Sequence, residues 1–465
     1  MRQAVLWLCF ALLALPAWAQ DGNQEPASQE EPAQEEPQQE PTLERKVEEL
    51  DQQLRVLTRQ IELEKEAAAE KAKTAGQATA GRDGFSLRTA DGNFQLKVRG
   101  YVQADNRFFL GDDERPATDT FILRRVRPIF EGTLYKIFDF RIMPDFGGGQ
   151  TVLQDAYLEG KLSPRFRVRA GKFKAPVGLE RLQSGTDILF VERALPTNLV
   201  PNRDLGIQIG GDLGGGVANY AVGVFNGVAD GTSADVDSTD DKDVVARFFF
   251  TPFTKGSGPL KNLGFGVGAS QGKQEGTLTA TGLAPYRTPG QQTFFSYRSD
   301  GTAAGTVIAA GDRFRLSPQG YFYRGPFGLL AEYVISRQEV LRAAAFEELE
   351  HTSWQLAGSW VFGGEPTFRA VNPKKNFDLA ADTWGAFELK ARYSKLELDD
   401  ATFPTFASPT SSAESAEAWA AGFNWYLNRN LRLYFDYERT QFEGGATVGD
   451  REDESIFFSR FQISF

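Results

Sequence analysis

Residues 94–103 read Phe94-Gln95-Leu96-Lys97-Val98-Arg99-Gly100-Tyr101-Val102-Gln103. Its apolar and small residues hold the even positions, and its polar or amphipathic residues mostly hold the odd ones. Since successive side chains of a β-strand point to opposite faces of the sheet, this alternation predicts a strand with one apolar and one polar face. The same period of two returns in 125–134, 138–145 and 387–394, so an all-β fold is expected from residue 85 onward.

Soluble β-sandwiches share this alternation, because they also have one buried and one wet face. The spacing of the strands favours a transmembrane barrel instead. Tight connections at 135–137 and 428–430 contrast with long ones at 111–120 and 399–414, a contrast typical of transmembrane barrels. About sixteen strand-like segments can be counted, with the stretch 292–322 ambiguous, and an even number of this size lies in the usual range.

The end of the chain supports the same fold. Phe457, Phe461, Ile463 and the terminal Phe465 share one face of the last expected strand, which Ser459 alone interrupts. This pattern is similar to the signal read by the machinery that assembles outer-membrane proteins. We therefore expect a transmembrane antiparallel β-barrel of about 16 strands, covering residues 85–465, preceded by a short α-helical coiled coil.

The first residues indicate export. Arg2, the apolar run 4–15 and Ala17-Trp18-Ala19 form a secretory signal peptide over 1–19, with cleavage before Gln20. Cys9 is the only cysteine, so we expect a mature protein without thiols or disulfides. With 38 Phe, 47 Gly, 2 Met and a mean hydropathy of −0.36, the chain suits a barrel with one apolar and one wet face.

Between the signal and the barrel, three segments are expected. Residues 20–41 are rich in Glu, Gln and Pro and should form a disordered spacer. Within 42–75, six apolar residues recur at alternating spacings of four and three, which predicts a coiled coil, with a lone amphipathic helix as the alternative. These six residues, called the heptad seam below, are Leu43, Val47, Leu50, Leu54, Leu57 and Ile61. Residues 76–84 should form a flexible linker.

Enzymatic chemistry finds little support in the sequence. His351 is the only histidine and no cysteine follows Cys9, so neither a nucleophile–base pair with cysteine nor a His/Cys metal site can form. Ser353 is a weak nucleophile candidate beside this histidine. The run 147–149 is three glycines without a following Lys-Ser/Thr, which predicts a turn and not a phosphate cradle. We expect no enzyme, catalytic residue, metal, cofactor or nucleic-acid partner.

Positive charge gathers in one part of the chain. Residues 121–203 hold 14 Lys/Arg and 8 Asp/Glu, a net charge of +6 in a chain whose net charge is −11. The arginines on the polar side of these strands are Arg125, Arg127, Arg141, Arg165, Arg167 and Arg169. Each arginine that faced lipid at the midplane of the bilayer would destabilise the barrel by about 2–4 kcal/mol. We therefore expect them in a wet lumen, where a basic wall attracts anions.

A second interpretation of these arginines stays open. They can pair with carboxylates of the same strands and only brace the lumen. The carboxylates concerned are Glu131, Asp139, Asp145 and Glu159.

A connection of about thirty residues, 172–204, interrupts the basic region. Connections of this length are usually functional. Apolar residues such as Leu179, Phe190 and Leu195 allow it to pack against a wall. It is expected to fold into the barrel and narrow it, and an external lid or a surface-receptor loop is the alternative.

Several motifs stand in order through this region. They are 123–132 (LRRVRPIFEG), 145–148 (DFGG), 155–158 (DAYL), 171–180 (GKFKAPVGLE), 186–193 (TDILFVER), 203–206 (RDLG) and 223–227 (GVFNG). Together they resemble the phosphate-selective porin O and P family, from about residue 85 to the end and most specifically over 121–227. The resemblance implies a sixteen-stranded homotrimeric barrel in the outer membrane. Its third external loop would fold inward, and a basic ladder would guide oxyanions to a central site.

The family pattern also assigns candidate residues, with the inward loop at 174–204. The candidate cations of the loop or constriction are Lys172, Lys174, Arg181, Arg193 and Arg203. The candidate members of the lumen ladder are Arg125, Arg127, Arg141, Arg167 and Arg169.

The implied function is passive diffusion of small inorganic anions, with phosphate or polyphosphate preferred. Outer-membrane lipid and further copies of the chain are the implied partners. The N-terminal region would lie in the periplasm, where the coiled coil could hold peptidoglycan. A non-selective pore, or a structural protein tethered to the cell wall through its coiled coil, remains the alternative.

Overall fold

The computed structural model describes residues 42–465 except 112–116, 238, 255 and 257. The expected signal peptide and spacer lie outside the described residues. The chain divides into two units, Met1–Glu70 and Lys71–Phe465. Helix α1 (Leu43–Thr74) is the described element that begins in the first unit.

Helix α1 carries the heptad seam on its surface. All six seam residues are exposed, from 45 % for Ile61 to 82 % for Leu43. A helix is therefore present where one is expected, and its association with other helices stays a prediction. Within the described chain, no helix combines the length and apolar character needed to cross a membrane.

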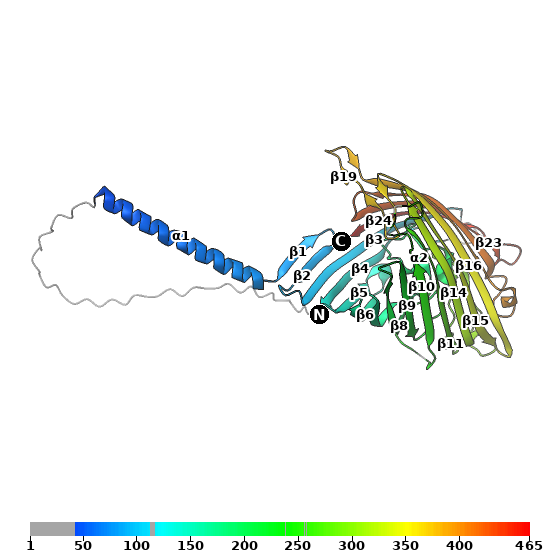
Figure 1. The fold of residues 1–465 in the computed structure, drawn as a ribbon. Helices are drawn as coiled ribbons and strands as arrows, with labels where there is room; N and C mark the ends of the chain where they lie inside the picture. Colours follow the sequence, from blue (N-terminus) through cyan, green and yellow to red (C-terminus); the bar gives the residue numbers. More distant parts are fainter. Residues whose placement is uncertain (1–41, 112–116, 238, 255, 257) are drawn as a thin grey trace, which may run out of the picture. The chain divides into compact units, whose positions relative to one another are not determined.

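The second unit contains a closed sheet of sixteen antiparallel strands (Figure 1). Each strand pairs with its neighbours in sequence, and the last strand pairs with the first to close the barrel. The strands are β3 (Phe94–Phe109), β4 (Thr120–Leu134), β5 (Phe138–Asp145), β6 (Val152–Ser163), β7 (Phe166–Lys174), β8 (Arg203–Leu213), β9 (Ala218–Phe225), β10 (Asp243–Phe250), β11 (Leu263–Glu275), β14 (Ile308–Arg324), β15 (Phe327–Arg342), β16 (Ala345–Phe362), β21 (Ala386–Glu397), β22 (Ala413–Tyr426), β23 (Leu431–Gly444) and β24 (Glu454–Ser464). The expected barrel and its strand number are confirmed.

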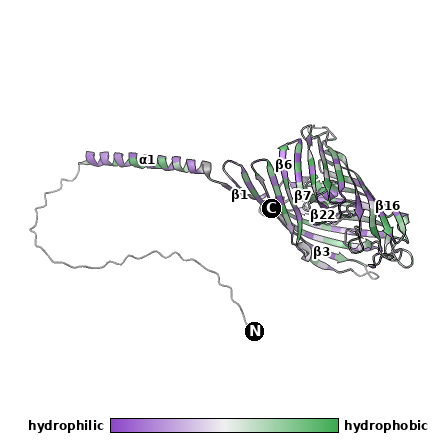
Figure 2. Ribbon diagram, turned by 90° about the horizontal axis from the view of Figure 1, so that it is seen from below, coloured by the Kyte–Doolittle hydropathy of each residue, from purple (hydrophilic) through white to green (hydrophobic). Residues whose placement is uncertain are grey.

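The two faces of the barrel wall differ in the way the alternation predicts. Hydrophilic and hydrophobic residues alternate along the strands in Figure 2. Along β16, Ser353 and Gln355 are buried toward the inside, whereas Leu356 and Trp360 are 47 % and 43 % exposed on the outside. Fully buried side chains include Arg313, Arg315 and Arg460. Because the inside is charged and the outside apolar, the sandwich alternative is excluded.

The two ends of the barrel carry different connections. One end, called the turn end, has tight links such as 325–326, and the other, called the loop end, has long ones such as 276–307. Three connections depart from this rule, since 343–344 is a tight turn at the loop end, whereas 251–262 and 363–385 are long and lie at the turn end. The ambiguous stretch 292–322 holds one short strand and most of β14.

These connections also contain short β-ladders and 3-10 helices. The ladders are β12 (Tyr286–Arg287) with β13 (Thr293–Phe295), β17 (Gly364–Glu365) with β18 (Asn372–Pro373), and β19 (Phe377–Asp378) with β20 (Thr383–Trp384). The 3-10 helices are η1 (Gly147–Gly149), η2 (Leu195–Asn198) and η3 (Asp400–Thr402).

The expected linker 76–84 is replaced by a β-hairpin. Strand β1 (Gln77–Gly81) pairs with β2 (Gly84–Arg88), and β2 pairs with the first residues of β3. Strand β3 extends past the end of β24, so its free edge supplies backbone partners for β2. Phe85 also packs edge-on against Phe465, with ring centroids 6.2 Å apart. The linker prediction was wrong because this free edge is not visible in the local sequence.

Candidate functional site

The connection between β7 and β8, residues 175–202, lies against the inner wall and is called the inward segment. It contains the short helix α2 (Leu179–Leu182) and helix η2. Most of its apolar side chains are almost fully buried, with exposed fractions of 0 to 1 %. They include Val177, Leu179, Ile188, Phe190, Val191 and Leu195. The apolar residues that the sequence offers for packing therefore hold this segment inside the barrel.

Inward-facing wall residues bind the backbone of the segment. Leu189 O accepts hydrogen bonds from Lys390 Nζ at 2.9 Å and from Arg432 Nη2 at 3.3 Å. Val191 O accepts one from Arg460 Nη1 at 2.6 Å. These donors come from β21, β23 and β24, so three strands of the wall hold the backbone of the segment.

Glu192 is the strongest anchor of the inward segment. Its carboxylate lies 2.8 Å from Arg107, 2.5 Å from Arg124 and 3.2 Å from Arg125, and Arg460 follows at 3.7 Å. Burial alone would raise the pKa of Glu192, but the surrounding guanidinium groups hold it well below its usual range. The carboxylate is thus ionised and joins β3, β4 and β24 to the segment.

A β-bulge brings two consecutive arginines to this carboxylate. Gln103 pairs with Arg125 and Ala104 pairs with Leu123, so Arg124 has no partner across the ladder. A bulge inserts one unpaired residue and redirects its side chain. Arg124, which the period of two would place on the outer face, therefore reaches Glu192 inside.

The five candidate ladder arginines all form ion pairs with carboxylates. Arg125 pairs with Glu192, Arg127 with Asp145 at 2.7 Å, Arg141 with Glu131 at 2.8 Å, Arg167 with Asp212, and Arg169 with Glu159 at 2.6 Å. Arg165 instead lies exposed in the turn 164–165. Three of the four carboxylates named in the bracing interpretation take part in these pairs, and Asp139 pairs with Lys161 at 2.8 Å.

Two of the five candidate loop cations also pair with carboxylates. Lys172 pairs with Asp235, and Arg203 Nε lies 2.8 Å from Asp155 Oδ1. Lys172 and Arg203 stand within β7 and β8, at the two feet of the inward segment. Their charges are therefore offset locally.

The other three loop cations bind only backbone carbonyls. Lys174 Nζ donates to Gln183 O at 2.6 Å, and Arg193 Nη2 donates to the same oxygen at 2.8 Å. Arg181 donates to Thr197 O. Within the described part of the chain, none of these three cations has a carboxylate within ion-pair distance. They hold the segment's own backbone and keep a net positive charge.

A cavity of about 360 Å³ opens beside these groups toward the loop end. Its charged lining comprises five arginines and two carboxylates. They are Arg124, Arg125, Arg181, Arg193 and Arg287, with Glu192 and Asp230. Asp230 is itself bound by Arg315 at 2.6 Å. The lining therefore carries an excess of three positive charges, and guanidinium groups are suited to hold tetrahedral oxyanions.

The electrostatics of Arg181 agree with this excess. Burial and the nearby Arg193 and Arg203 lower the pKa of Arg181 to about 9. The carboxylates of Glu180 and Glu332 oppose this shift only in part. An anion in the cavity would supply further negative charge.

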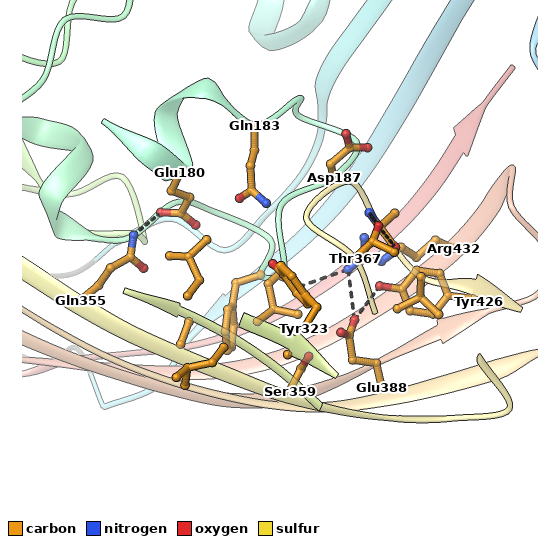
Figure 3. Close-up of a pocket in the computed structure, with 18 residues that line it drawn as sticks. Glu180, Gln183, Asp187, Tyr323, Gln355, Ser359, Thr367, Glu388, Tyr426 and Arg432 are labelled. Carbon is orange, nitrogen blue, oxygen red and sulfur yellow. Dashed lines mark hydrogen bonds and ion pairs between the residues drawn. The ribbon is translucent and has the colours of Figure 1, made fainter. Parts of the chain in front are cut away.

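The opposite side of the inward segment is different. There a cavity of only about 30 Å³ separates the segment from β14, β15, β16, β21, β22 and β23. Figure 3 shows Glu180 and Asp187 of the segment on one side of it and Glu388 on the wall. Glu388 accepts a hydrogen bond from Tyr426 at 2.5 Å. This side is narrow and carries carboxylates, so it does not suit anions.

A larger cavity of about 460 Å³ lies at the turn end. Its lining includes Tyr101 of the wall, Asp187 of the inward segment and several arginines. The arginines are Arg82, Arg99, Arg369 and Arg429. The basic side of the segment therefore has an open space at either end of the barrel.

His351 has a structural environment. It is 2 % exposed, its Nε2 lies 2.8 Å from the Tyr297 hydroxyl, and its Nδ1 accepts a hydrogen bond from Asp399 N at 3.1 Å. Ser353 donates to Lys395 O at 2.6 Å and not to the histidine. Among the residues with described positions, no group of three or more His, Cys, Asp or Glu is placed to hold a metal.

Sequence reasoning missed several residues of this site. Glu192 was not recognised as the anchor, and Arg124, Arg287 and Arg460 were not proposed for the lumen. The neighbouring pair at 124–125 was a usable signal for a bulge. Arg460 gave none, because its role depends on contacts with Asp105 and Val191, which are hundreds of residues away along the chain.

Comparison with protein families gives one match that covers most of the chain. The family model described as phosphate-selective porin O and P matches residues 94–465. Porin O of Pseudomonas aeruginosa is 22 % identical over 418 residues, which cover 83 % of this chain and 91 % of that protein.

Solved structures of similar fold include two channel proteins. The outer membrane channel DcaP of Acinetobacter baumannii has a TM-score of 0.51 and 11 % identity, covering 83 % of this chain and 99 % of that one. An anion-selective porin from Comamonas acidovorans has a TM-score of 0.50 and 12 % identity, covering 80 % and 100 %. At such identities the likeness concerns the fold.

Proposed function

The chain belongs to the phosphate-selective porin O and P family, and from this premise we propose that it is an outer-membrane porin through which small anions diffuse. The closed barrel, with an apolar outside and a charged inside, supports a place in a bilayer. The turn end would face the periplasm and the loop end the outside. No residue of the site needs to act as a catalyst for this function.

The proposed preference for anions rests on three lumen cations that have no carboxylate partner among the described residues. Lys174, Arg181 and Arg193 stand in the lumen without carboxylate partners among the described residues, and the last two line the cavity with an excess of three positive charges. Positive groups that line a pore attract anions and repel cations. The ladder arginines contribute less, because each is offset by a carboxylate.

Preference for phosphate over chloride is the finer part of the proposal. Arg181 and Arg193 each present planar N–H groups, and such forks bind tetrahedral oxyanions through two hydrogen bonds at once. Chloride is a single acceptor atom and does not offer the two separate oxygens that match the two donors of one fork. The relative in Pseudomonas aeruginosa is named porin O, which states no solute. The preference for phosphate is therefore inferred from Arg181 and Arg193.

Planar-bilayer recording of the purified protein tests both parts. In a potassium chloride gradient, the reversal potential should have the sign of an anion-preferring pore. Added inorganic phosphate should reduce the chloride current. A reversal potential of the opposite sign would refute the anion preference, and an unchanged chloride current would refute the phosphate preference alone.

We also propose a homotrimer whose periplasmic N-terminal helices pair through the heptad seam. The six seam residues are exposed in the single chain, and three copies would bury them against one another. Removing residues 42–73 should leave the reversal potential unchanged while lowering the melting temperature of the trimer. A trimer of unchanged stability would show that the helix has another partner.

A structural role is the second candidate function, favoured by the same exposed seam. A protein tethered to peptidoglycan through α1 would keep the envelope together, and its pore would be incidental. Deleting residues 42–73 in cells should then increase the release of outer-membrane vesicles. An intact envelope in that strain would leave diffusion as the function.

A further inference from the structure

Two cavities flank residues 184–186 of the inward segment. The cavity of about 360 Å³ at the loop end is lined by Arg125 of the wall. The cavity of about 460 Å³ at the turn end is lined by Tyr101 of the wall and by Ser184 and Thr186 of the segment. Of the described residues, none lines both cavities. The boundary between the two cavities therefore lies at this stretch of the segment and at the wall beside it.

Gly185 lies close to lining residues of both cavities. A β-carbon at Gly185 would lie 2.9 Å from Tyr101 Oη and 3.3 Å from Arg125 Cδ. The carbonyl oxygen of Gly185 accepts a hydrogen bond from Gln103 Nε2 at 2.8 Å, which holds the segment at this distance from the wall. Because glycine has no side chain, the space in front of the Tyr101 hydroxyl stays free.

Four side chains of the wall form a block beside Gly185. Tyr101 and Gln103 of β3 pair across the ladder with Arg127 and Arg125 of β4, respectively. Arg125 Nη1 donates to Gln103 Oε1 at 2.7 Å, and Arg127 Nη1 donates to Tyr101 Oη at 2.8 Å. The four residues are 0 to 8 % exposed. These contacts give the Tyr101 hydroxyl a defined position.

The Tyr101 hydroxyl has a hydrogen-bond donor that the described residues do not use. A phenol hydroxyl can donate one hydrogen bond and also accept one. Tyr101 Oη accepts from Arg127, and no acceptor among the described residues lies at hydrogen-bond distance from its O–H. The guanidinium bonded to this oxygen polarises the O–H, which makes it a stronger donor. A solute at the boundary thus meets a neutral donor next to the arginines.

We propose that Tyr101 is a specificity-determining residue of the pore, whose hydroxyl donates a hydrogen bond to an oxyanion at the boundary between the two cavities. Inorganic phosphate has several acceptor oxygens, so it can bind Tyr101 through one oxygen while another faces a cation. Chloride has a single acceptor atom. The inference rests on the proposed function and deepens it, because it adds a neutral donor to the cations of the inward segment.

A purely structural role is the alternative for this hydroxyl. Its oxygen also holds Arg127, which forms an ion pair with Asp145 at 2.7 Å. If the hydroxyl only braced Arg127, its loss would change the wall for every anion alike. If it binds the oxyanion, its loss weakens the phosphate block and leaves the chloride current as it is. The two roles therefore differ in which current they change.

Tyr101→Phe in the full chain removes the hydroxyl and keeps the ring. Tyr157→Phe is the matched control, because Tyr157 stands on the inner side of β6, where its ring lies 4.4 Å from the guanidinium carbon of Arg169. Its hydroxyl forms no hydrogen bond with the described residues. Planar-bilayer recording gives the chloride conductance, the reversal potential in potassium chloride, and the concentration of inorganic phosphate that halves the chloride current.

The half-blocking concentration should rise roughly fivefold in Tyr101→Phe, the usual weight of one hydrogen bond, and stay unchanged in Tyr157→Phe. Chloride conductance and reversal potential should stay unchanged in both. An unaltered half-blocking concentration would overturn the role of Tyr101 and keep the porin. A changed reversal potential or chloride conductance in Tyr101→Phe would assign the hydroxyl to bracing Arg127, which also overturns the inference. Absence of phosphate block in the natural protein would overturn the proposed phosphate preference and this inference with it.

Gly185→Ala gives a second test, because its methyl group would fill the space in front of the hydroxyl. Alone, this substitution should raise the half-blocking concentration at least twofold. In the Tyr101→Phe background it should change that concentration less than twofold, since both substitutions remove the same contact. Effects that multiply independently would place the bound phosphate away from this boundary and overturn the assignment.

Discussion

The cations of the barrel wall and those of the inward segment differ in what they bind. On β4 to β7, arginines such as Arg127, Arg141 and Arg169 lie within 3 Å of carboxylates of the same wall. On the inward segment, Arg181 and Arg193 donate to backbone carbonyls instead. The wall therefore holds many cations with little net charge, and the segment holds few with a surplus.

The partner of each cation determines whether it can attract an anion in the lumen. A cation paired with a carboxylate is offset at short range, so it attracts a second anion weakly. A carbonyl oxygen satisfies the hydrogen bonds of a cation without cancelling its charge. The site of anion attraction should thus lie on the inward segment, and the wall pairs should mainly hold the barrel in shape.

The largest change in conductance and stability should come from substituting Glu192, the residue that joins the wall to the inward segment. Glu192→Gln leaves Arg107, Arg124, Arg125 and Arg460 without the carboxylate between them. Losing one partner of a buried ion pair costs about 3–5 kcal/mol. The inward segment should then leave the wall intermittently, so single-channel current should fluctuate between levels, and the melting temperature measured by circular dichroism should fall.

Glu159→Gln is the matched control, because Glu159 pairs with Arg169 on the wall and does not contact the inward segment. This variant should keep a single, steady conductance level. Equal fluctuation in both variants would mean that the carboxylate of Glu192 has no special part in fixing the segment.

The second-largest effect should come from removing the unpaired positive charge of the inward segment. Arg181→Gln with Arg193→Gln removes two unpaired charges but keeps an N–H donor for each carbonyl. At about 5 Å and an effective dielectric constant of about 20, one charge contributes about 3 kcal/mol to an ion in the lumen. The ratio of anion to cation permeability, from reversal potentials, should fall at least tenfold.

An ion pair of the barrel wall provides the matched control for this double variant. Arg167→Gln with Asp212→Asn removes one charge of each sign from the pair on β7 and β8. This double variant should change the permeability ratio less than twofold. A tenfold change would show that the ladder attracts anions despite its carboxylates.

The alternation of side chains predicted the strands, because the period of two depends only on neighbours in the sequence. The contrast between tight and long connections then favoured a barrel over a sandwich, and the gap between strands revealed the long connection 172–204 inside the basic region. The net positive charge of that region could be counted from the sequence, but the sequence did not show which of its cations are paired with carboxylates. Glu192 and Arg460 stand far apart in sequence, and only the closed barrel brings them to 3.7 Å.

Local irregularities explain the remaining differences. Arg124 enters the lumen through a bulge that the period of two does not predict. The hairpin of β1 and β2 forms because β3 has a free edge beyond β24, a property of the closed sheet. Both features depend on pairing between strands, so sequence patterns within one strand cannot show them.

The smallest expected effect separates the shape of the cations from their charge. Arg181→Lys with Arg193→Lys keeps both charges on the inward segment, so the reversal potential in potassium chloride should not change. An ammonium group lacks the planar fork of guanidinium and binds a phosphate oxygen through single contacts. The loss should be about 1 kcal/mol, or roughly fivefold in the phosphate concentration that halves the chloride current. If that concentration stays the same while the Gln double variant raises it, charge alone attracts phosphate, and the two arginines act on every anion alike.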